Sequence, residues 1–417
     1  VVGVDTDQSK IGRLARGQAP IFEPGLDDLL TAGLDQGRLS FQTDIAAVAG
    51  AQIHFICVGT PQRPDGPGAD LRALEAAVSA LAENLAAGAV VVGKSTVPVG
   101  TARRLAEPVA QGGGELVWNP EFLREGHAVS DTLRPDRIVL GLAEPATPSR
   151  AATLLDRLYR PMLEAGTPRL TMSYESAELV KTAANSYLAL RVSFINAVSD
   201  LADAAGGDIQ DVAAALRLDE RIGSRFFNPG LGFGGGCLPK DLRSMIARAD
   251  ELGLSATSAL LTAADQVNEA RSDRAAELAA AALGGSLQGR RIALLGLSFK
   301  PLSDDIRQSQ SIRLGEAMVR AGALVTATDP AALAAAKVEH RSLAYAESVA
   351  EAVAQADLVV LATEWDEYRQ LDPASLAALS PARTVLDARG VLDAARWTAA
   401  GWTVHSPGRP TFFGSTV

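Results

Sequence analysis

The sequence predicts an α/β protein in which two Rossmann-like domains flank a helical middle block. Three observations indicate this fold class. Short, continuous apolar runs recur in the first third of the chain and again in the last third, and helix-like segments separate them. A long stretch without Pro or Gly interrupts the alternation. Such apolar runs are typical of parallel strands buried on both faces, and strand–helix alternation is typical of doubly wound domains.

The first part of the chain is expected to form a Rossmann-like domain over residues 1–170. Its strands are expected at 1–5, 52–58, 89–93 and 116–118, and its helices near 26–32 and 71–87. A middle block over 171–285 is expected to be helical, with one long spine helix over 174–206. The strand rhythm then resumes at 291–297, 323–328, 357–363, 384–387 and 402–405, which predicts a second α/β domain over 286–417.

Composition excludes several function classes. The chain has 417 residues, 39 Lys+Arg and 49 Asp+Glu, for a net charge of −10, and it has no long basic run, so nucleic acid and anionic membrane surfaces are poor candidate partners. An apolar segment long enough to span a membrane and a secretory signal are both missing from the sequence. Two cysteines are too few for a disulfide framework. These features favour a reducing cytoplasm, and no metal site is expected.

Cys237 is the strongest candidate for a nucleophile. It follows four glycines in GFGGGCLPKD, which would let the backbone approach a ligand closely. Pro239 favours a helix start just beyond it, and the positive end of a helix stabilises a thiolate. Lys240 and Asp241 follow directly. A small buried thiol in a glycine-rich turn is the alternative interpretation.

Lys181 and Asn185 are four residues apart in a predicted helix, so an ammonium and an amide share one face. Together they could hold an oxyanion or alkoxide. A solvated helix face is the alternative, but the Ala- and Leu-rich surroundings predict that the face is buried, and a buried lysine needs a partner.

Further candidates follow the predicted strands. Glu121 and Glu125 are four apart in NPEFLREG, where a short helix begun by Pro120 would align both carboxylates, either as a base and a positioning group or simply as surface charges. Ser95, Thr96 and Thr60 come after strands, where ligands sit in open α/β sheets.

Candidates for contacts with a nucleotide lie in both α/β domains. Asp5 ends the first strand, the place of a ribose-binding acid, although a helix cap or turn is a common alternative role. Lys300 and Arg307 lie at a strand-to-helix turn of the second α/β domain, where a phosphate would be favoured, or where they could form surface salt bridges.

Taken together, these motifs resemble the UDP-glucose/GDP-mannose dehydrogenase family from end to end. The resemblance rests on VVGVD (1–5), PIFEPGL (20–26), CVGTP (57–61), KSTVPVGT (94–101), NPEFLREG (119–126), SAELVKTAANSYLA (176–189), RIGSRFFNPGLGFGGGCLPKD (221–241), GLSFKP (296–301) and TEWDEY (363–368). It implies an NAD-binding Rossmann-like domain, a central helical domain that dimerises and a C-terminal nucleotide-sugar domain.

The resemblance also implies the chemistry. Family members use NAD to oxidise the C6 alcohol of a sugar, here UDP-glucose, to a carboxylate in two hydride transfers through a thiohemiacetal and a thioester. By resemblance Cys237 is the nucleophile, and Lys181 with Asn185 stabilises the alkoxide. Asp241 and Thr96 hold a water, and Glu121 assists hydrolysis.

The same resemblance implies the binding residues. For NAD they are Asp5, Lys10, Thr60, Thr96, Glu125, Lys240 and Arg307. For the nucleotide sugar they are Glu121, Phe122, Leu123, Arg124, Glu125, Lys181, Asn185, Arg221, Phe226, Phe227, Asn228, Pro229, Gly230, Gly234 and Lys300. Arg221 matches a residue that reaches the substrate of the neighbouring subunit, which implies a functional dimer.

The chain departs from the family pattern in two places. It starts inside the Rossmann unit, without the first strand and the glycine-rich turn, as expected of an N-terminally truncated sequence. Gly236 also stands where the family often has Ser before the cysteine. Other hypotheses remain open: oxidation of GDP-mannose or another nucleotide sugar, a non-catalytic nucleotide-sugar binder, and a two-electron hydroxyacid dehydrogenase of related architecture.

Overall fold

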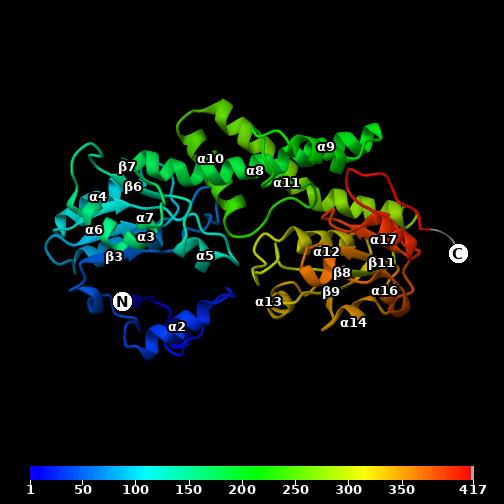
Figure 1. Cartoon of the computed structure of the whole chain (residues 1–417), viewed down its shortest axis with the longest axis horizontal. Helices are drawn as coiled ribbons and strands as arrows, with labels where there is room; N and C mark the ends of the chain where they lie inside the picture. The colour runs from blue at the N-terminus through cyan, green and yellow to red at the C-terminus, as the bar shows by residue number, and fades with distance from the viewer. Residues whose placement is uncertain (415–417) are drawn as a thin grey trace. The chain divides into compact units, whose positions relative to one another are not determined.

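The computed structural model describes residues 1–414, which form two compact units. The first unit contains Val1–Asn185 and Lys240–Ser258, and the second contains Ser186–Pro239 and the described residues from Ala259 onward. Both units are mixed α/β structures built on a largely parallel sheet (Figure 1).

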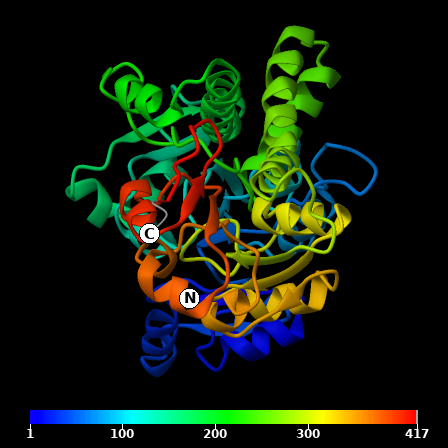
Figure 2. The ribbon, with the colours of Figure 1, turned by 90° about the vertical axis from the view of Figure 1, so that its right-hand side faces the viewer.

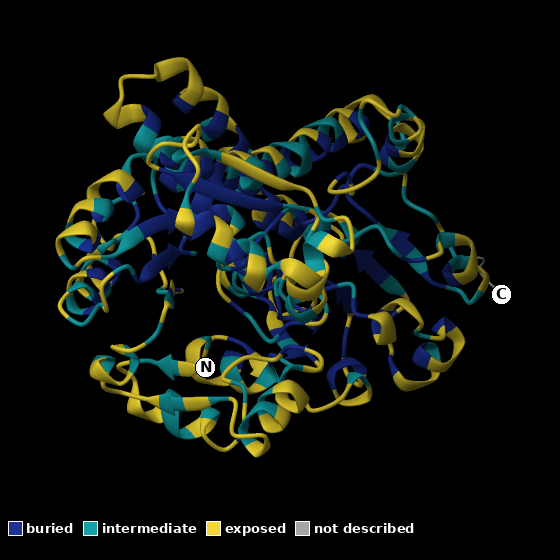
Figure 3. Cartoon of the chain, turned by 60° about the vertical axis from the view of Figure 1, so that its left-hand side comes forward, coloured by how far each residue is buried: buried dark blue, intermediate teal, exposed yellow. Residues whose placement is uncertain are grey.

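The main sheet of the first unit has five strands in the order β3 (Ile53–Ile56), β4 (Val90–Gly93), β5 (Glu115–Trp118), β6 (Ile138–Leu142) and β7 (Arg169–Ser173). All neighbours pair in parallel except β5 and β6. Val90, Val91 and Val92 are completely buried, as expected of a strand with helices on both faces. The strands stand out as buried in Figure 3.

Helices cover both faces of this sheet. On one face α3 (Arg72–Ala82) and α4 (Thr101–Gln111) contribute Leu74 and Leu105 to the core. On the other face α6 (Arg150–Leu158) contributes Leu155, with α7 (Arg160–Glu164) following it. The chain begins with a separate parallel pair, β1 (Val2–Val4) and β2 (Ser40–Gln42), accompanied by α1 (Gln8–Leu14), α2 (Leu26–Asp35) and the 3₁₀ turn η1 (Ile45–Val48).

The middle of the chain is helical, as predicted. It contains α8 (Tyr174–Ala205), α9 (Ile209–Arg217), α10 (Leu238–Glu251) and α11 (Ser255–Ala282). The 32 residues of α8 include no Pro or Gly, so nothing in the backbone interrupts it. Among the described residues, none of the helices combines the length and apolar character needed to span a membrane.

The sheet of the second unit has six strands, all parallel, in the order β10 (Ala344–Tyr345), β9 (Leu324–Thr328), β8 (Arg291–Leu295), β11 (Leu358–Leu361), β12 (Thr384–Asp387) and β13 (Thr403–His405). The order reverses direction between β8 and β11, which is the Rossmann switch point where ligands bind beyond the strand ends. In Figure 2 the right-hand side of Figure 1, which contains this sheet, faces the viewer.

Helices also cover both faces of the second sheet. Met318 of α12 (Gln310–Arg320) belongs to the core on one face, and α13 (Leu333–Glu339) packs beside it. The core on the other face includes residues from α14 (Val349–Val353), α15 (Asp366–Arg369), α16 (Pro373–Leu379) and α17 (Ala394–Ala399).

The predicted strands lie where the apolar runs placed them, but one site segment differs. Residues 119–126 do not form a helix begun by Pro120; they form a loop between β5 and α5 (Ala128–Leu133). Glu121 and Glu125 therefore do not share a helix face. The side chain of Glu121 instead accepts a hydrogen bond from the backbone of Leu123 (2.6 Å), which favours a turn over a helix.

Candidate active site

Lys181 is buried on α8 and is paired with a carboxylate. Only 4% of the residue is exposed, and its Nζ lies 2.8 Å from Oε1 of Glu121, in the loop after β5. The predicted burial of this lysine is confirmed. The ion pair supplies the partner that a buried ammonium needs, and it leaves a positive charge beside a loop at the carboxyl edge of the sheet.

A second polar pair lies one turn further along the same helix. The Nδ2 atom of Asn185 donates to Oδ2 of Asp241 (2.6 Å), and Nζ of Lys240 lies 2.6 Å from the other oxygen of that carboxylate. Asp241 is 1% exposed and lies in the first turn of α10, where a negative charge is stabilised by the helix dipole. The α8 face thus presents a lysine–glutamate pair and an asparagine–aspartate pair.

The loops after β3 and β4 are tied together at the same edge of the sheet. The Thr60 hydroxyl donates to the carbonyl of Thr96 (2.6 Å), and the Ser95 hydroxyl donates to the carbonyl of Val58 (2.7 Å). Both loops therefore hold hydroxyl-bearing residues at the strand ends, where the sequence predicted them.

A buried network beside Glu121 was missed by sequence reasoning. Lys94 Nζ and the Tyr159 hydroxyl both donate to Oδ1 of Asn119, at 3.1 and 2.6 Å, and Asn119 Nδ2 donates to the carbonyl of Val139. Burial lowers the pKa of Lys94 and raises the pKa of Tyr159 to about 12. The available signal was Lys94 itself, which opens the KSTVPVG motif directly after a buried strand.

Asp5 and Lys10 pair at the end of β1. Lys10 Nζ lies 2.7 Å from Oδ2 of Asp5, and the backbone N–H of Asp7 donates to the other oxygen. Burial works to raise the pKa of Asp5, but the hydrogen bonds from Lys10 and from the Asp7 backbone, together with the charge of Lys10, outweigh it, so the pKa of this carboxyl is lowered. Both side chains remain more than 30% exposed, so the charged carboxylate is accessible to a ligand.

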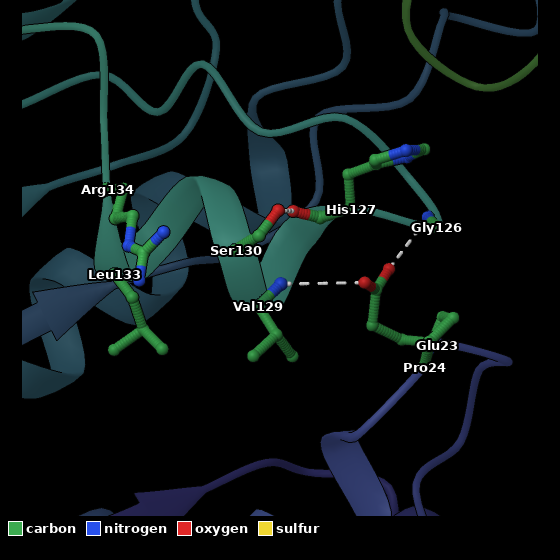
Figure 4. A pocket seen from close by; sticks show the side chains of 8 residues that line it. All are labelled: Glu23, Pro24, Gly126, His127, Val129, Ser130, Leu133 and Arg134. Carbon is green, nitrogen blue, oxygen red and sulfur yellow. Dashed lines mark hydrogen bonds between the residues drawn. The ribbon is translucent and has the colours of Figure 1, made fainter.

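Glu23, in the motif PIFEPGL, supports the loop that contains Glu125. Its carboxylate accepts hydrogen bonds from the backbone N–H groups of Gly126 (2.8 Å) and Val129 (3.5 Å), and Figure 4 shows it pointing at both. These residues line a cavity of about 420 Å³, together with His127 and Arg134. Sequence reasoning quoted the motif but gave Glu23 no role.

The other residues of the NPEFLREG loop lie near the surface of the protein. Arg124 forms a bidentate pair with Asp131 of α5 (2.6 and 2.9 Å). The ring of Phe122 lies between two cations, with the Cζ atom of Arg137 3.8 Å and the Nζ atom of Lys181 5.8 Å from its centroid. Leu123 is 41% exposed.

In the second unit, the glycine-rich segment before Cys237 lies against the loops at the switch point. Gly235 N–H donates to the carbonyl of Arg307 (2.9 Å), and Arg389, which follows β12, donates to the carbonyl of Gly232 (3.2 Å). A Cβ atom on Gly234 would lie 2.3 Å from the carbonyl oxygen of Gln308. This close approach requires glycine.

Gly236 and Cys237 complete this segment. A Cβ atom on Gly236 would lie 2.5 Å from Cζ of Arg307, whose guanidinium is held by the Asp305 carboxylate at 2.7 Å. Cys237 is exposed and immediately precedes α10. The predicted helix start is confirmed, one residue before Pro239.

The residues proposed for the nucleotide sugar flank this segment. The N–H of Gly230 donates to Asn196 of α8 (2.8 Å), and Asn228 accepts a hydrogen bond from Arg217. Phe226 has a left-handed backbone (φ 55°), while Phe227 is buried and stacks on Phe194. Pro229 lies between Asn228 and Gly230.

Two cations complete the predicted set in this unit. Lys300 lies above the ring of Phe299, with Nζ 5.3 Å from the centroid, in the loop after β8. Arg221 is highly exposed and pairs with Asp219 at 2.6 Å.

Comparison with known proteins identifies the family. Models of the UDP-glucose/GDP-mannose dehydrogenase family match three consecutive stretches of the chain: the NAD binding domain over residues 1–163, the central domain over 175–270 and the UDP binding domain over 293–394. The chain belongs to the UDP-glucose/GDP-mannose dehydrogenase family. The resemblance inferred from the motifs is confirmed, as is the fold of an NAD-binding Rossmann domain, a helical central domain and a C-terminal UDP-binding domain.

Individual members of the UDP-glucose/GDP-mannose dehydrogenase family are similar over almost their whole length. A UDP-glucose 6-dehydrogenase of Rhizobium meliloti is 40% identical over 98% of this chain and 94% of the relative. One from Pseudomonas aeruginosa is 39% identical over 98% of this chain and 92% of the relative. The solved structure of a UDP-glucose dehydrogenase from Pyrobaculum islandicum matches with a TM-score of 0.85 at 39% identity, covering 94% of this chain and 89% of that chain.

Proposed function

We propose that this chain is an NAD-dependent UDP-glucose 6-dehydrogenase that converts the C6 alcohol of UDP-glucose to the carboxylate of UDP-glucuronate. The observation that supports it most directly is the α8 face, where Lys181 is buried against Glu121 and Asn185 is bound to Asp241. The full-length similarity to enzymes named for UDP-glucose favours this substrate over GDP-mannose.

In the first oxidation, C6 loses a hydride and its hydroxyl loses a proton. The buried Lys181 ammonium stabilises the negative charge that develops on the alcohol oxygen, and Asn185 adds a neutral donor. The low exposure of Lys181 strengthens this stabilisation, because charges interact more strongly where water is excluded.

In the second oxidation, Cys237 acts as the nucleophile. Its Sγ bonds to the aldehyde carbon to give a thiohemiacetal, from which a second hydride leaves to form a thioester. Water, held by Asp241 and Thr96 and assisted by Glu121, then breaks the carbon–sulfur bond. This step releases the carboxylate and regenerates the thiol.

NAD is the hydride acceptor for both oxidations. The accessible carboxylate of Asp5 at the end of β1 suits the ribose hydroxyls of a dinucleotide, and Lys10 fixes its position. Thr60 and Thr96 lie at adjacent strand ends. Glu125, Lys240 and Arg307 complete the proposed cofactor contacts.

We propose two sets of contacts for the nucleotide sugar, and each set lies within one unit. In the first unit these are the NPEFLREG loop from Glu121 to Glu125, with Lys181 and Asn185. In the second unit they are Phe226, Phe227, Asn228, Pro229, Gly230, Gly234 and Lys300. The close packing of the 230–236 segment against the switch-point loops supports this assignment.

We also propose that the protein acts as a homodimer in the cytoplasm, with Arg221 reaching the substrate of the neighbouring subunit. An exposed apolar stripe on α8, consisting of Tyr187, Phe194 and Leu201, supports a protein–protein interface. Neither Cys57 nor Cys237 forms a disulfide in the described chain, in keeping with a reducing compartment.

Turnover with alternative substrates tests the proposal. We expect NADH release with UDP-glucose, with two NADH formed per sugar, and little or none with GDP-mannose. In Cys237→Ala, formation of UDP-glucuronate is expected to stop. Turnover with GDP-mannose alone, or full activity of the Cys237→Ala variant, would contradict the proposal, and UDP-sugar binding without NADH release would indicate a non-catalytic binder.

A further inference from the structure

Glu178 is a buried carboxylate on α8 to which neither the comparisons nor the proposed mechanism gives a role. It is 1% exposed, and it lies three residues before Lys181 and seven before Asn185, on the same face of the helix. A buried charged group is unfavourable unless hydrogen-bond partners compensate for the loss of its hydration.

Its partners are backbone amides at the start of α4. The N–H of Gly100 donates to one carboxylate oxygen at 2.6 Å, and the N–H of Ala102 donates to the other at 2.5 Å. Gly100 is the N-cap of α4 in a left-handed conformation (φ +95°), and it has no side chain that could cap the helix itself. Glu178 therefore supplies the missing cap from a different helix.

The segment held in this way is the loop that contains Thr96. Residues 94–100 connect β4 to α4, and the bonds from Thr60 to Thr96 and from Ser95 to Val58 also hold them. Arg248 of α10 also donates to the carbonyl of Val99 (3.1 Å). The Glu178 contact joins this loop by hydrogen bonds to the helix of Lys181 and Asn185.

We propose that Glu178 is a positioning residue that fixes the Thr96 loop relative to Lys181 and Asn185, and that it does so as a carboxylate. This inference rests on the proposed function for the roles of those three residues. Both oxygens must act as acceptors, and a protonated carboxyl or an amide would turn one of them into a donor facing a backbone N–H.

Ionisation of this group falls in the neutral range. Burial raises the pKa of Glu178 to about 7, against the lowering effect of the Ala102 and Gly100 amides. The charged side chains around it are Glu175 on its own helix, which raises the pKa further and is itself paired with Arg103 of α4, and Arg248 of α10. As the pH rises through 7, ionisation makes both oxygens acceptors for the Gly100 and Ala102 amides, while burial of the new charge lowers the stability of the whole chain.

Glu178→Gln and Glu175→Gln form a matched test. Both remove one negative charge from the same end of α8, but Glu175 pairs with the side chain of Arg103 in α4 rather than with the backbone amides at the start of that helix. Hydrogen–deuterium exchange of the segment 98–105 is measured at pH 7.5, with a β4 peptide as reference. We expect exchange about tenfold faster in Glu178→Gln and unchanged in Glu175→Gln.

Kinetics provide the second readout. In Glu178→Gln we expect kcat with UDP-glucose to fall about 10- to 100-fold, with a smaller change in KM, because loop misplacement affects the reacting geometry most. The activity of the unmodified chain is expected to rise between pH 6 and 8 as Glu178 ionises. This rise should be lost in Glu178→Gln and kept in Glu175→Gln.

Several results would overturn the inference. Equal exchange in Glu178→Gln and the unmodified chain would show that the carboxylate does not hold the loop, and equal losses in both variants would reduce its role to general helix packing. If the unmodified chain failed to oxidise UDP-glucose, the proposed function would be wrong, and the exchange comparison alone would decide whether Glu178 holds the loop.

Discussion

Lys181 is a charged side chain buried by the fold, and its removal is expected to reduce activity far more than stability. Lys181→Met leaves the Glu121 carboxylate without its partner, but that side chain is 27% exposed, so water can solvate the charge and the loss of stability is small. In Lys181→Met we expect turnover to fall more than about 100-fold. The free energy of unfolding should change by less than about 1 kcal/mol. Urea denaturation and NADH assays on one preparation check both.

Glu121→Gln serves as the comparison for this prediction. It leaves the buried ammonium, whose side chain is only 5% exposed, without its carboxylate, so we expect a loss of stability of about 3–5 kcal/mol. A Lys181→Met variant less stable than Glu121→Gln would contradict the prediction.

The raised pKa of Glu178 predicts that the stability of the chain changes with pH, and the direction of the change follows from the pKa values in the folded and unfolded states. Its pKa of about 7 in the folded chain lies above the ordinary value of 4.5. The neutral form is thus favoured by folding, and its stabilising contribution is complete below pH 4.5 and is lost as the pH rises to about 7. The stability advantage of the unmodified chain over Glu178→Gln should therefore be larger at pH 5 than at pH 8, by up to ~3 kcal/mol. A difference that grows with pH would be the opposite result.

At the scale of elements, the glycine-rich segment depends on close backbone contact with the loops of the second sheet. Gly234→Ala would place a Cβ atom 2.3 Å from a carbonyl oxygen, so the segment must shift. Overpacking of this kind lowers the free energy of unfolding by about 1–3 kcal/mol. We therefore expect KM for UDP-glucose to rise about tenfold or more.

A matched substitution at an uncrowded glycine isolates this effect. Gly50 has no neighbour within 4 Å of an added Cβ and no left-handed backbone. Gly50→Ala should leave KM unchanged. Identical KM values for the two variants would argue against substrate binding by this segment.

At the scale of the whole molecule, the exposed stripe on α8 predicts self-association. Tyr187, Phe194 and Leu201 follow each other at seven-residue intervals, so they share one helix face, and each is more than half exposed. Light scattering should give about twice the chain mass of 43.4 kDa. Leu201→Glu should shift the protein to monomer, because it buries an unpaired charge in the interface.

Val338→Glu provides the control for this prediction. Val338 is 70% exposed on α13, outside the stripe, so a charge there should leave the mass unchanged. A monomeric unmodified chain, or dissociation by both variants, would contradict an interface on this face of α8.

Sequence reasoning recovered the elements with strong local signals. The apolar runs that became β4, β8 and β11 and the uninterrupted helix α8 were predicted, because burial and the absence of Pro and Gly are local properties. The three-residue, mostly exposed β2 was missed, since its strand character comes from pairing with β1. The run at Ile138–Leu142, which forms β6, was also missed despite its apolar character.

The candidate site was partly predictable for the same reason. Lys181 and Asn185 share a face because helix geometry fixes their spacing, and this was predicted. The contact of Glu178 with Gly100 and Ala102 joins residues more than 70 positions apart, so no local pattern could reveal it. The assumed helix at Glu121 failed because the turn formed by the side chain of Glu121 competes with helix formation.

The crowding at Gly236 has a consequence for substitutions at this position. The space that a Cβ atom at position 236 would need is occupied by the guanidinium of Arg307, which pairs with Asp305. Serine at this position would require the side chain of Arg307 to move. A side chain at position 236 therefore acts through the placement of the Arg307 guanidinium, and a substitution there should be examined together with one at position 307.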